Sequence, residues 1–121
     1  MNPNLNNIIP QLDEWLEDEM VSSFIVGITK DVEAREDSYN GYQLFPIAEG
    51  DQRTVVQAEC DLIDYYLSHD CLKDKCDNDR SAAGTGQVRE VKQLYIGVRY
   101  NKAPIGANLI MFSDLDIPII L

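Results

Sequence analysis

The residues best suited to bind a metal are the three cysteines and the single histidine of the chain, Cys60, His69, Cys71 and Cys76. Zinc in proteins prefers four thiolate or imidazole ligands arranged as a tetrahedron. One loop could supply three of them, because one residue separates His69 from Cys71 and four separate Cys71 from Cys76; Cys60 would supply the fourth. The paired C-x₂-C spacing of structural zinc sites is missing. We therefore expect three reduced thiols and no cofactor, with a small zinc-binding regulator as an alternative.

Other chemical motifs are incomplete. The oxygen-rich run at residues 74–81 departs from a calcium-binding EF-hand loop, since Ala82 stands at the position of the turn glycine and Val88 at that of the closing glutamate. Residues 84–86, Gly-Thr-Gly, lack the lysine of a phosphate-binding loop. No serine lies in a Gly-x-Ser-x-Gly elbow, and the lone histidine makes no catalytic triad with its sequence neighbours. The sequence therefore predicts a protein that is not an enzyme.

Charge is abundant and unevenly distributed. The chain carries 21 acidic and 10 basic residues, a net charge of −11. Such a balance disfavours direct binding to nucleic acid, whose phosphates require a basic surface. Residues 1–79 hold 18 of the acidic side chains and 5 of the basic ones, whereas residues 80–121 hold 3 and 5. If the two parts form different faces, copies of the chain can associate head to tail through opposite charges.

An amphipathic helix is predicted near the N-terminus, with apolar residues at helical spacing and an acidic face opposite them. Asn4 can cap it, and Pro10 lies near enough to its start to fit the first turns or to mark its beginning. No basic residue precedes Lys30, so the acidic face gains no cross-turn ion pairs and offers a docking surface to a basic partner. The apolar residues are Leu5, Ile8, Ile9, Leu12, Trp15, Leu16 and Met20, and the predicted docking residues are Asp13, Glu14, Glu17, Asp18 and Glu19.

The middle of the chain gives weaker patterns. We expect the helix to end near residues 20–23 and a strand to follow it around Phe24. Asn40-Gly41 predicts a tight hairpin turn, and residues 42–47 an edge strand, because Pro46 interrupts them. Residues 54–67 fit both a helix and an alternating strand; the alternation is cleaner, so we predict a strand over about residues 53–64.

The last third of the sequence combines a hairpin with an apolar end. Residues 87–113 predict an antiparallel hairpin with one buried face, preceded by a polar insertion at residues 68–86. Residues 114–121 form an apolar C-terminal tail, which either packs on its own sheet or joins the sheet edge of a partner. The tail residues expected to make these contacts are Leu115, Ile117, Ile119, Ile120 and Leu121.

Together these segments predict one α+β domain over residues 1–121: an N-terminal amphipathic acidic helix packed on a mostly antiparallel sheet of about four to five strands. This order of elements is similar to that of the small tail-terminator and head–tail joining subunits of tailed bacteriophages. The resemblance implies a non-enzymatic, ring-forming structural component of a virion, with protein partners and a homo-oligomeric or larger assembly.

The alternative function is a small acidic inhibitor that imitates DNA and occupies the basic groove of a nucleic-acid enzyme. No apolar run reaches the length of a membrane span, and the N-terminus lacks the features of a signal peptide. We expect no membrane and no small-molecule substrate, and a location in the cytoplasm or in a virion assembled in the host cytoplasm.

Overall fold

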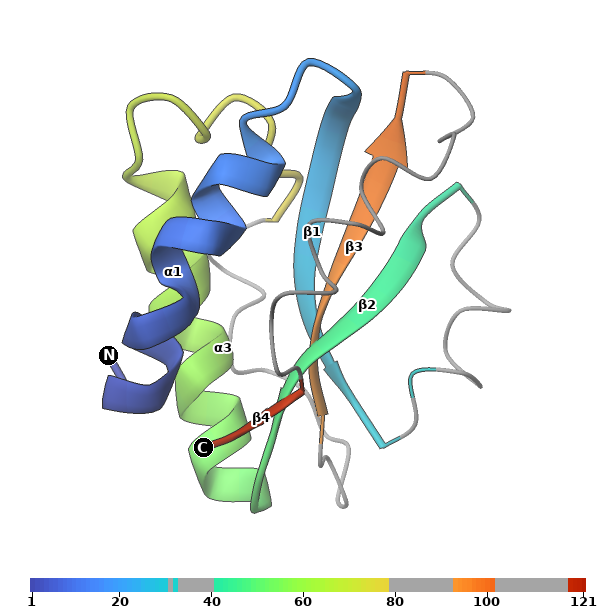
Figure 1. Ribbon diagram of the computed structural model, residues 1–121. Coiled ribbons are helices and arrows are strands. Elements are labelled where there is room, and N and C mark those ends of the chain that lie inside the picture. Colours follow the sequence, from blue (N-terminus) through green and yellow to red (C-terminus); the bar gives the residue numbers. More distant parts are fainter. Residues whose placement is uncertain (31, 33–40, 79–92, 102–117) are drawn as a thin grey trace.

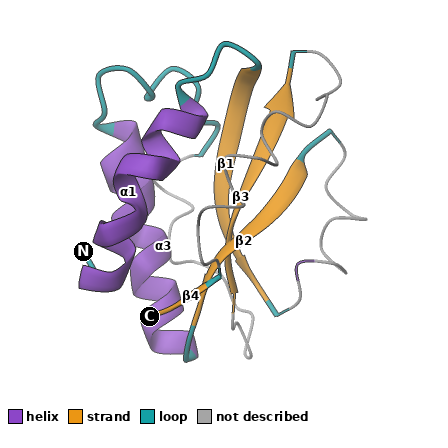
Figure 2. Cartoon of the chain, in the orientation of Figure 1, coloured by secondary structure: helices purple, strands orange, loops and turns teal. Residues whose placement is uncertain are grey.

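The computed structural model describes residues 1–30, 32, 41–78, 93–101 and 118–121, and these residues form two helices and one four-stranded mixed sheet. The sheet has the strand order β1-β3-β2-β4, and both helices lie on one of its faces (Figure 1, Figure 2). The predicted α+β fold is therefore confirmed. The elements are α1 (Pro3–Leu16), β1 (Val21–Thr29), β2 (Gln43–Glu49), α3 (Gln52–Leu67), β3 (Gln93–Tyr100) and β4 (Ile119–Ile120).

Helix α1 begins earlier than expected. Asn2, rather than Asn4, is its N-cap: Oδ1 of Asn2 accepts hydrogen bonds from the amides of Asn4 and Leu5, and Pro3 occupies the first turn. Pro10 lies inside the helix, where it removes one main-chain hydrogen bond. Tertiary packing offsets that cost, since the predicted apolar stripe is buried. Its buried members are Leu5, Ile8, Ile9, Leu12, Trp15 and Leu16.

The predicted strand at residues 53–64 is wrong, because this segment belongs to helix α3. Asp51 caps the helix by accepting a hydrogen bond from the Thr54 amide at 3.0 Å. A strand would bury alternate residues, whereas the helix buries one continuous stripe that faces α1 and the sheet. That stripe consists of Val55, Ala58, Leu62, Ile63 and Tyr66.

Strand β3 is the centre of the sheet and pairs antiparallel with both β1 and β2. The prediction of one buried face is wrong here, since residues 94–98 are all buried. On the helical side Leu94, Ile96 and Val98 join the main core, and on the other side Tyr95 packs with Leu44 in a smaller cluster. The predicted return strand of the hairpin, at residues 109–112, lies outside the described residues.

Each helix is fixed to the sheet by a perpendicular aromatic pair. The rings of Trp15 in α1 and Phe45 in β2 have their centroids 5.2 Å apart. Those of Tyr66 in α3 and Phe24 in β1 are 5.0 Å apart. Helix α1 ends at Leu16 and β1 begins at Val21, so the predicted strand after the helix is confirmed but the helix ends before residues 20–23.

Strand β2 combines an irregular register with a second partner. The register shifts between Pro46 and Ala48, which accommodates the missing amide of the proline. Gly41 has a φ of +90°, as a turn glycine would, but the described partners of β2 are β3 and β4 rather than β1. Asn40, the other residue of the predicted hairpin turn, lies outside the described residues.

The end of the chain packs on its own sheet. Ile119 pairs with Ala48 in a parallel arrangement, and the amide of Leu121 donates a hydrogen bond to the Glu49 carbonyl at 2.9 Å. No helix in the described ranges has the length and apolar character needed to cross a lipid bilayer.

Candidate functional site

The C-terminal ends of the two helices form a polar junction around Asp13. This residue is not on the exposed acidic face as predicted, since its side chain is only 15% exposed. The Tyr65 hydroxyl of α3 donates a hydrogen bond to Oδ2 of Asp13, and Nε2 of His69 lies 3.7 Å from the same oxygen. Asp13 therefore joins α1 to α3 and to the turn that follows α3.

The ring of His69 has a defined orientation. Its Nδ1 accepts hydrogen bonds from the amides of Cys71 at 3.1 Å and Leu72 at 3.2 Å. A neutral imidazole that accepts at Nδ1 carries its proton on Nε2, so the protonated nitrogen is the one that lies 3.7 Å from the Asp13 carboxylate. The ring also meets Tyr65 edge to face, with the centroids 5.6 Å apart.

Two tyrosines at this junction resist ionisation. Burial and then the hydrogen bond to Asp13 raise the pKa of Tyr65 to about 12. Burial also raises the pKa of Tyr66 well above its ordinary value of 10, and the charge of Asp13 adds to the effect. Both hydroxyls therefore stay protonated at physiological pH, and that of Tyr65 serves as a donor to Asp13.

The structure does not bring the four predicted zinc ligands together. His69 and Cys71 instead form a group with Glu17, in which one possible ligand atom from each residue lies within 4.8 Å of the others. Glu17 was predicted only as a docking residue. Its proximity to His69 depends on how α1 crosses α3, which no local sequence pattern records.

The other two cysteines lie elsewhere in the fold. Cys60 is half-buried on α3, and Cys76 lies beside β1, where its thiol donates to Oδ1 of Asn78 at 3.5 Å. Burial raises the pKa of both thiols. All three cysteines of the chain are free thiols in the structure.

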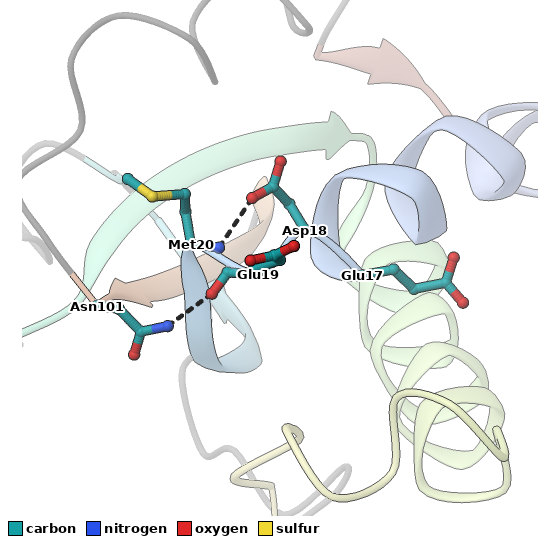
Figure 3. Close-up of a pocket in the computed structure, with 5 residues that line it drawn as sticks. All are labelled: Glu17, Asp18, Glu19, Met20 and Asn101. Carbon is teal, nitrogen blue, oxygen red and sulfur yellow. Dashed lines mark hydrogen bonds between the residues drawn. The ribbon is translucent and has the colours of Figure 1, made fainter.

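The segment from Glu17 to Met20 borders a surface groove of about 500 Å³, which Asn101 closes from the end of β3 (Figure 3). The side-chain nitrogen of Asn101 donates a hydrogen bond to the Glu19 carbonyl at 2.6 Å. The main-chain amide of Asn101 donates a hydrogen bond to the Met20 carbonyl at 2.8 Å. Asp18 accepts a hydrogen bond from the Met20 amide. Glu17 belongs to two places, since it lines the groove and also lies in the group with His69 and Cys71. Figure 3 shows its carboxylate pointing away from Met20 and Asn101.

The negative charges of Glu17, Asp18 and Glu19 interact unfavourably with the dipole of α1, because they follow its C-terminal end. Carboxylates are unfavourable at the C-terminal end of a helix, where the free carbonyls already carry partial negative charge. The last turn of α1 contains no basic residue. Lys75 compensates in part, because its ammonium group donates to the carbonyls of Leu16 and Asp18, both at 3.0 Å.

The other predicted docking residues are divided. Glu14 and Glu19 are exposed, in agreement with the expected acidic face, and Asp18 is half-buried. In the tail, Ile119 and Leu121 pack against the main core, while Ile120 is 67% exposed. The remaining tail residues, Leu115 and Ile117, lie outside the described residues.

Comparisons with protein-family models, with curated proteins and with solved structures found no match to this chain.

Proposed function

We propose that this protein is a non-enzymatic subunit of a larger protein assembly, and that it docks through the acidic end of α1 onto a basic surface of its partner. One observation carries the proposal. Glu17, Asp18 and Glu19 follow the negative end of a helix, and the ion pair found among the described residues, His69 with Asp13, involves none of the three.

This arrangement costs stability in the isolated chain, because the carboxylates lie at the helix end that already carries partial negative charge. A lysine or arginine from a partner would relieve this repulsion. The groove has a suitable mixed lining, since Met20 offers an apolar contact to the methylene groups of such a side chain while Glu19 offers charge. Complementary charge of this kind increases the rate and specificity of association.

The partner we propose is another copy of the chain, as in the ring-forming tail-terminator and head–tail joining subunits of phage particles assembled in a host cytoplasm. The uneven charge of the sequence supports head-to-tail contacts. Residues 118–121 pack on β2 of the same chain, so the proposal relies on the acidic end of α1 and not on exchange of these residues.

That packing also favours the second candidate, a monomeric acidic inhibitor of a nucleic-acid enzyme. The described part of the C-terminal tail does not reach out as an arm. Such an inhibitor would present the same acidic groove to a basic site without assembling with copies of itself.

Native mass spectrometry of the untagged protein at low and moderate salt tests the proposal. The assembly function predicts a defined multimer that dissociates when salt is raised. Glu19→Lys should weaken the multimer by roughly tenfold, because it places a positive charge in the groove. The matched control is Asp74→Lys, an equal charge reversal at an exposed position outside the groove, and it should leave the multimer unchanged.

A monomer under all conditions would contradict the assembly function. Binding of an oligo-arginine peptide to that monomer would then support the inhibitor function, provided that Glu19→Lys abolishes binding and Asp74→Lys does not. Equal effects of the two reversals would contradict both functions, since only net charge would matter.

A further inference from the structure

We propose that Glu17, His69 and Cys71 form a zinc site at the junction of α1 and the turn after α3. The three residues offer a carboxylate oxygen, an imidazole nitrogen and a thiol sulfur, and these atoms all lie within 4.8 Å of one another. Zinc bonds of about 2.0–2.3 Å place tetrahedral ligand atoms roughly 3.3–3.8 Å apart. The side chains of Glu17 and Cys71 are exposed and can close by the remaining distance of about 1–1.5 Å.

The orientation of His69 is a second and independent argument. Histidines that bind zinc usually donate their other ring N–H to a carboxylate, which fixes the tautomer and makes the ligating nitrogen more basic. Here Nε2 lies 3.7 Å from Oδ2 of Asp13, and the lone pair is on Nδ1, which accepts a hydrogen bond from the main-chain amide of Cys71. The ring therefore has the tautomer that ligation through Nδ1 requires.

Asp13 is itself held in place. Tyr65 donates a hydrogen bond to the oxygen that faces His69, and the side chain of Asp13 is mostly buried. The fixed carboxylate gives the protonated Nε2 a negatively charged neighbour at 3.7 Å, which favours this orientation of the imidazole. We assign Asp13 as a positioning residue, which acts on the metal only through His69.

Binding of zinc has a structural consequence. The amides of Cys71 and Leu72 now share the Nδ1 lone pair, at 3.1 and 3.2 Å, and a metal ion would replace them there. The turn must shift to let this happen, so the two amides should report directly on occupancy. Nitrogen and sulfur donors favour zinc over calcium or magnesium, and three protein ligands leave the fourth position to water or to a residue of a partner.

The test uses the untagged, reduced full-length protein with Zn²⁺ and with Co²⁺ as its spectroscopic substitute. We expect one metal ion per chain, the visible bands of tetrahedral cobalt and a thiolate-to-cobalt charge-transfer band. Cys71→Ser should remove the charge-transfer band and stoichiometric binding. Cys60→Ser and Cys76→Ser are matched controls that should retain both, since neither thiol belongs to the group.

Two further variants separate a ligand from a positioning residue. Glu17→Gln should weaken binding as loss of a ligand does, and Asp13→Asn should lower the affinity by roughly 10- to 100-fold while leaving the charge-transfer band in place. Nitrogen NMR should show the zinc-induced change at Nδ1 of His69, with shifts of the Cys71 and Leu72 amides.

The proposal is overturned if no charge-transfer band forms, if Cys71→Ser retains it, or if zinc binds through Nε2. It is also overturned if Cys60→Ser or Cys76→Ser removes the metal while circular dichroism shows a folded protein. These readouts do not depend on oligomeric state, so failure here leaves the proposed assembly function unaffected.

Discussion

Asn78 forms two hydrogen bonds with the main chain of Val26: it accepts from the Val26 amide at 2.7 Å and donates to the Val26 carbonyl at 2.9 Å. Two residues earlier in β1, Phe24 bonds in the same way to the main chain of Lys75 and Asp77. Residues 75–78 thus cover part of the outer edge of β1. The side-chain amide of Asn78 occupies the position at which a neighbouring strand would otherwise pair with Val26.

Replacing Asn78 should therefore affect both stability and self-association. Asn78→Ala leaves two main-chain groups of Val26 without partners and should cost about 1–3 kcal/mol of unfolding free energy. It should also increase concentration-dependent association, because an open strand edge pairs with other chains. Urea unfolding and sedimentation velocity measure the two effects. Asn78→Asp keeps only the acceptor, so its stability and its self-association should lie between those of the wild type and Asn78→Ala. Wild-type behaviour of both variants would contradict the role of Asn78 in covering the edge of β1.

Gly27 should tolerate no side chain. A Cβ at this position would lie 2.2 Å from the hydroxyl of Tyr95, its cross-strand partner, and 2.3 Å from the ring carbon that bears it. Because Tyr95 is buried, Gly27→Ala should cost about 3 kcal/mol or more. Chemical denaturation provides the measurement.

Two other variants control for this clash. Gly97→Ala should cost less, since its nearest neighbour is the flexible end of Leu44 at 2.7 Å. In the double variant Gly27→Ala/Tyr95→Leu, the loss of unfolding free energy should be much smaller than the sum of the losses in the two single variants, because the shorter leucine leaves room for the new Cβ. Simple additivity would show that the ring of Tyr95 does not exclude a side chain at Gly27.

The pair of Tyr65 and Asp13 should make the protein sensitive to alkali. The pKa of Tyr65 is raised to about 12 in the folded state, so between pH 10 and 12 the unfolded chain loses this proton first. The stabilising contribution is complete below pH 10 and is lost as pH rises through 12. Tyr66, whose pKa is also raised, acts in the same direction.

Unfolding free energy measured across this pH range checks the prediction. Tyr65→Phe should reduce the slope of unfolding free energy against pH and cost about 1–3 kcal/mol at neutral pH, since it removes a hydrogen bond from the mostly buried carboxylate of Asp13. An unchanged alkaline slope in that variant would show that Tyr65 is not the titrating group.

The cap of α3 should contribute to acid sensitivity. Hydrogen bonds from the amide and then the side chain of Thr54 hold the pKa of Asp51 below its ordinary value of 3.8. The stabilisation is therefore present above pH 3.8 and is lost as pH falls below it. Asp51→Ser keeps a cap without a charge, so its stability should fall less steeply in acid than that of the wild type. Acid unfolding of the wild type and of Asp51→Ser, followed in parallel by circular dichroism, measures this difference. Equal dependence of stability on pH in the two proteins would show that Asp51 does not contribute.

The sequence alone determined α1, because its apolar spacing has one interpretation and predicted the buried stripe from Leu5 to Leu16. The run after it fitted both a helix and a short strand, and the strand that we favoured there is confirmed as β1. The apolar pattern at residues 54–67 also fitted both a helix and a strand, and the strand that we predicted from its cleaner alternation is wrong. The helix forms because it buries Val55, Ile63 and Tyr66 together, which the alternating strand pattern does not.

The tertiary structure alone decided the candidate site. The sequence pointed to His69 and Cys71 because histidine and cysteine are conspicuous, but it joined them to Cys60 and Cys76 rather than to Glu17. It also placed Asp13 among exposed docking residues. The periodicity of a segment records which of its sides is buried, whereas the approach of α1 to the end of α3 depends on how both helices pack on the sheet. Only that packing brings Asp13 and Glu17 to His69.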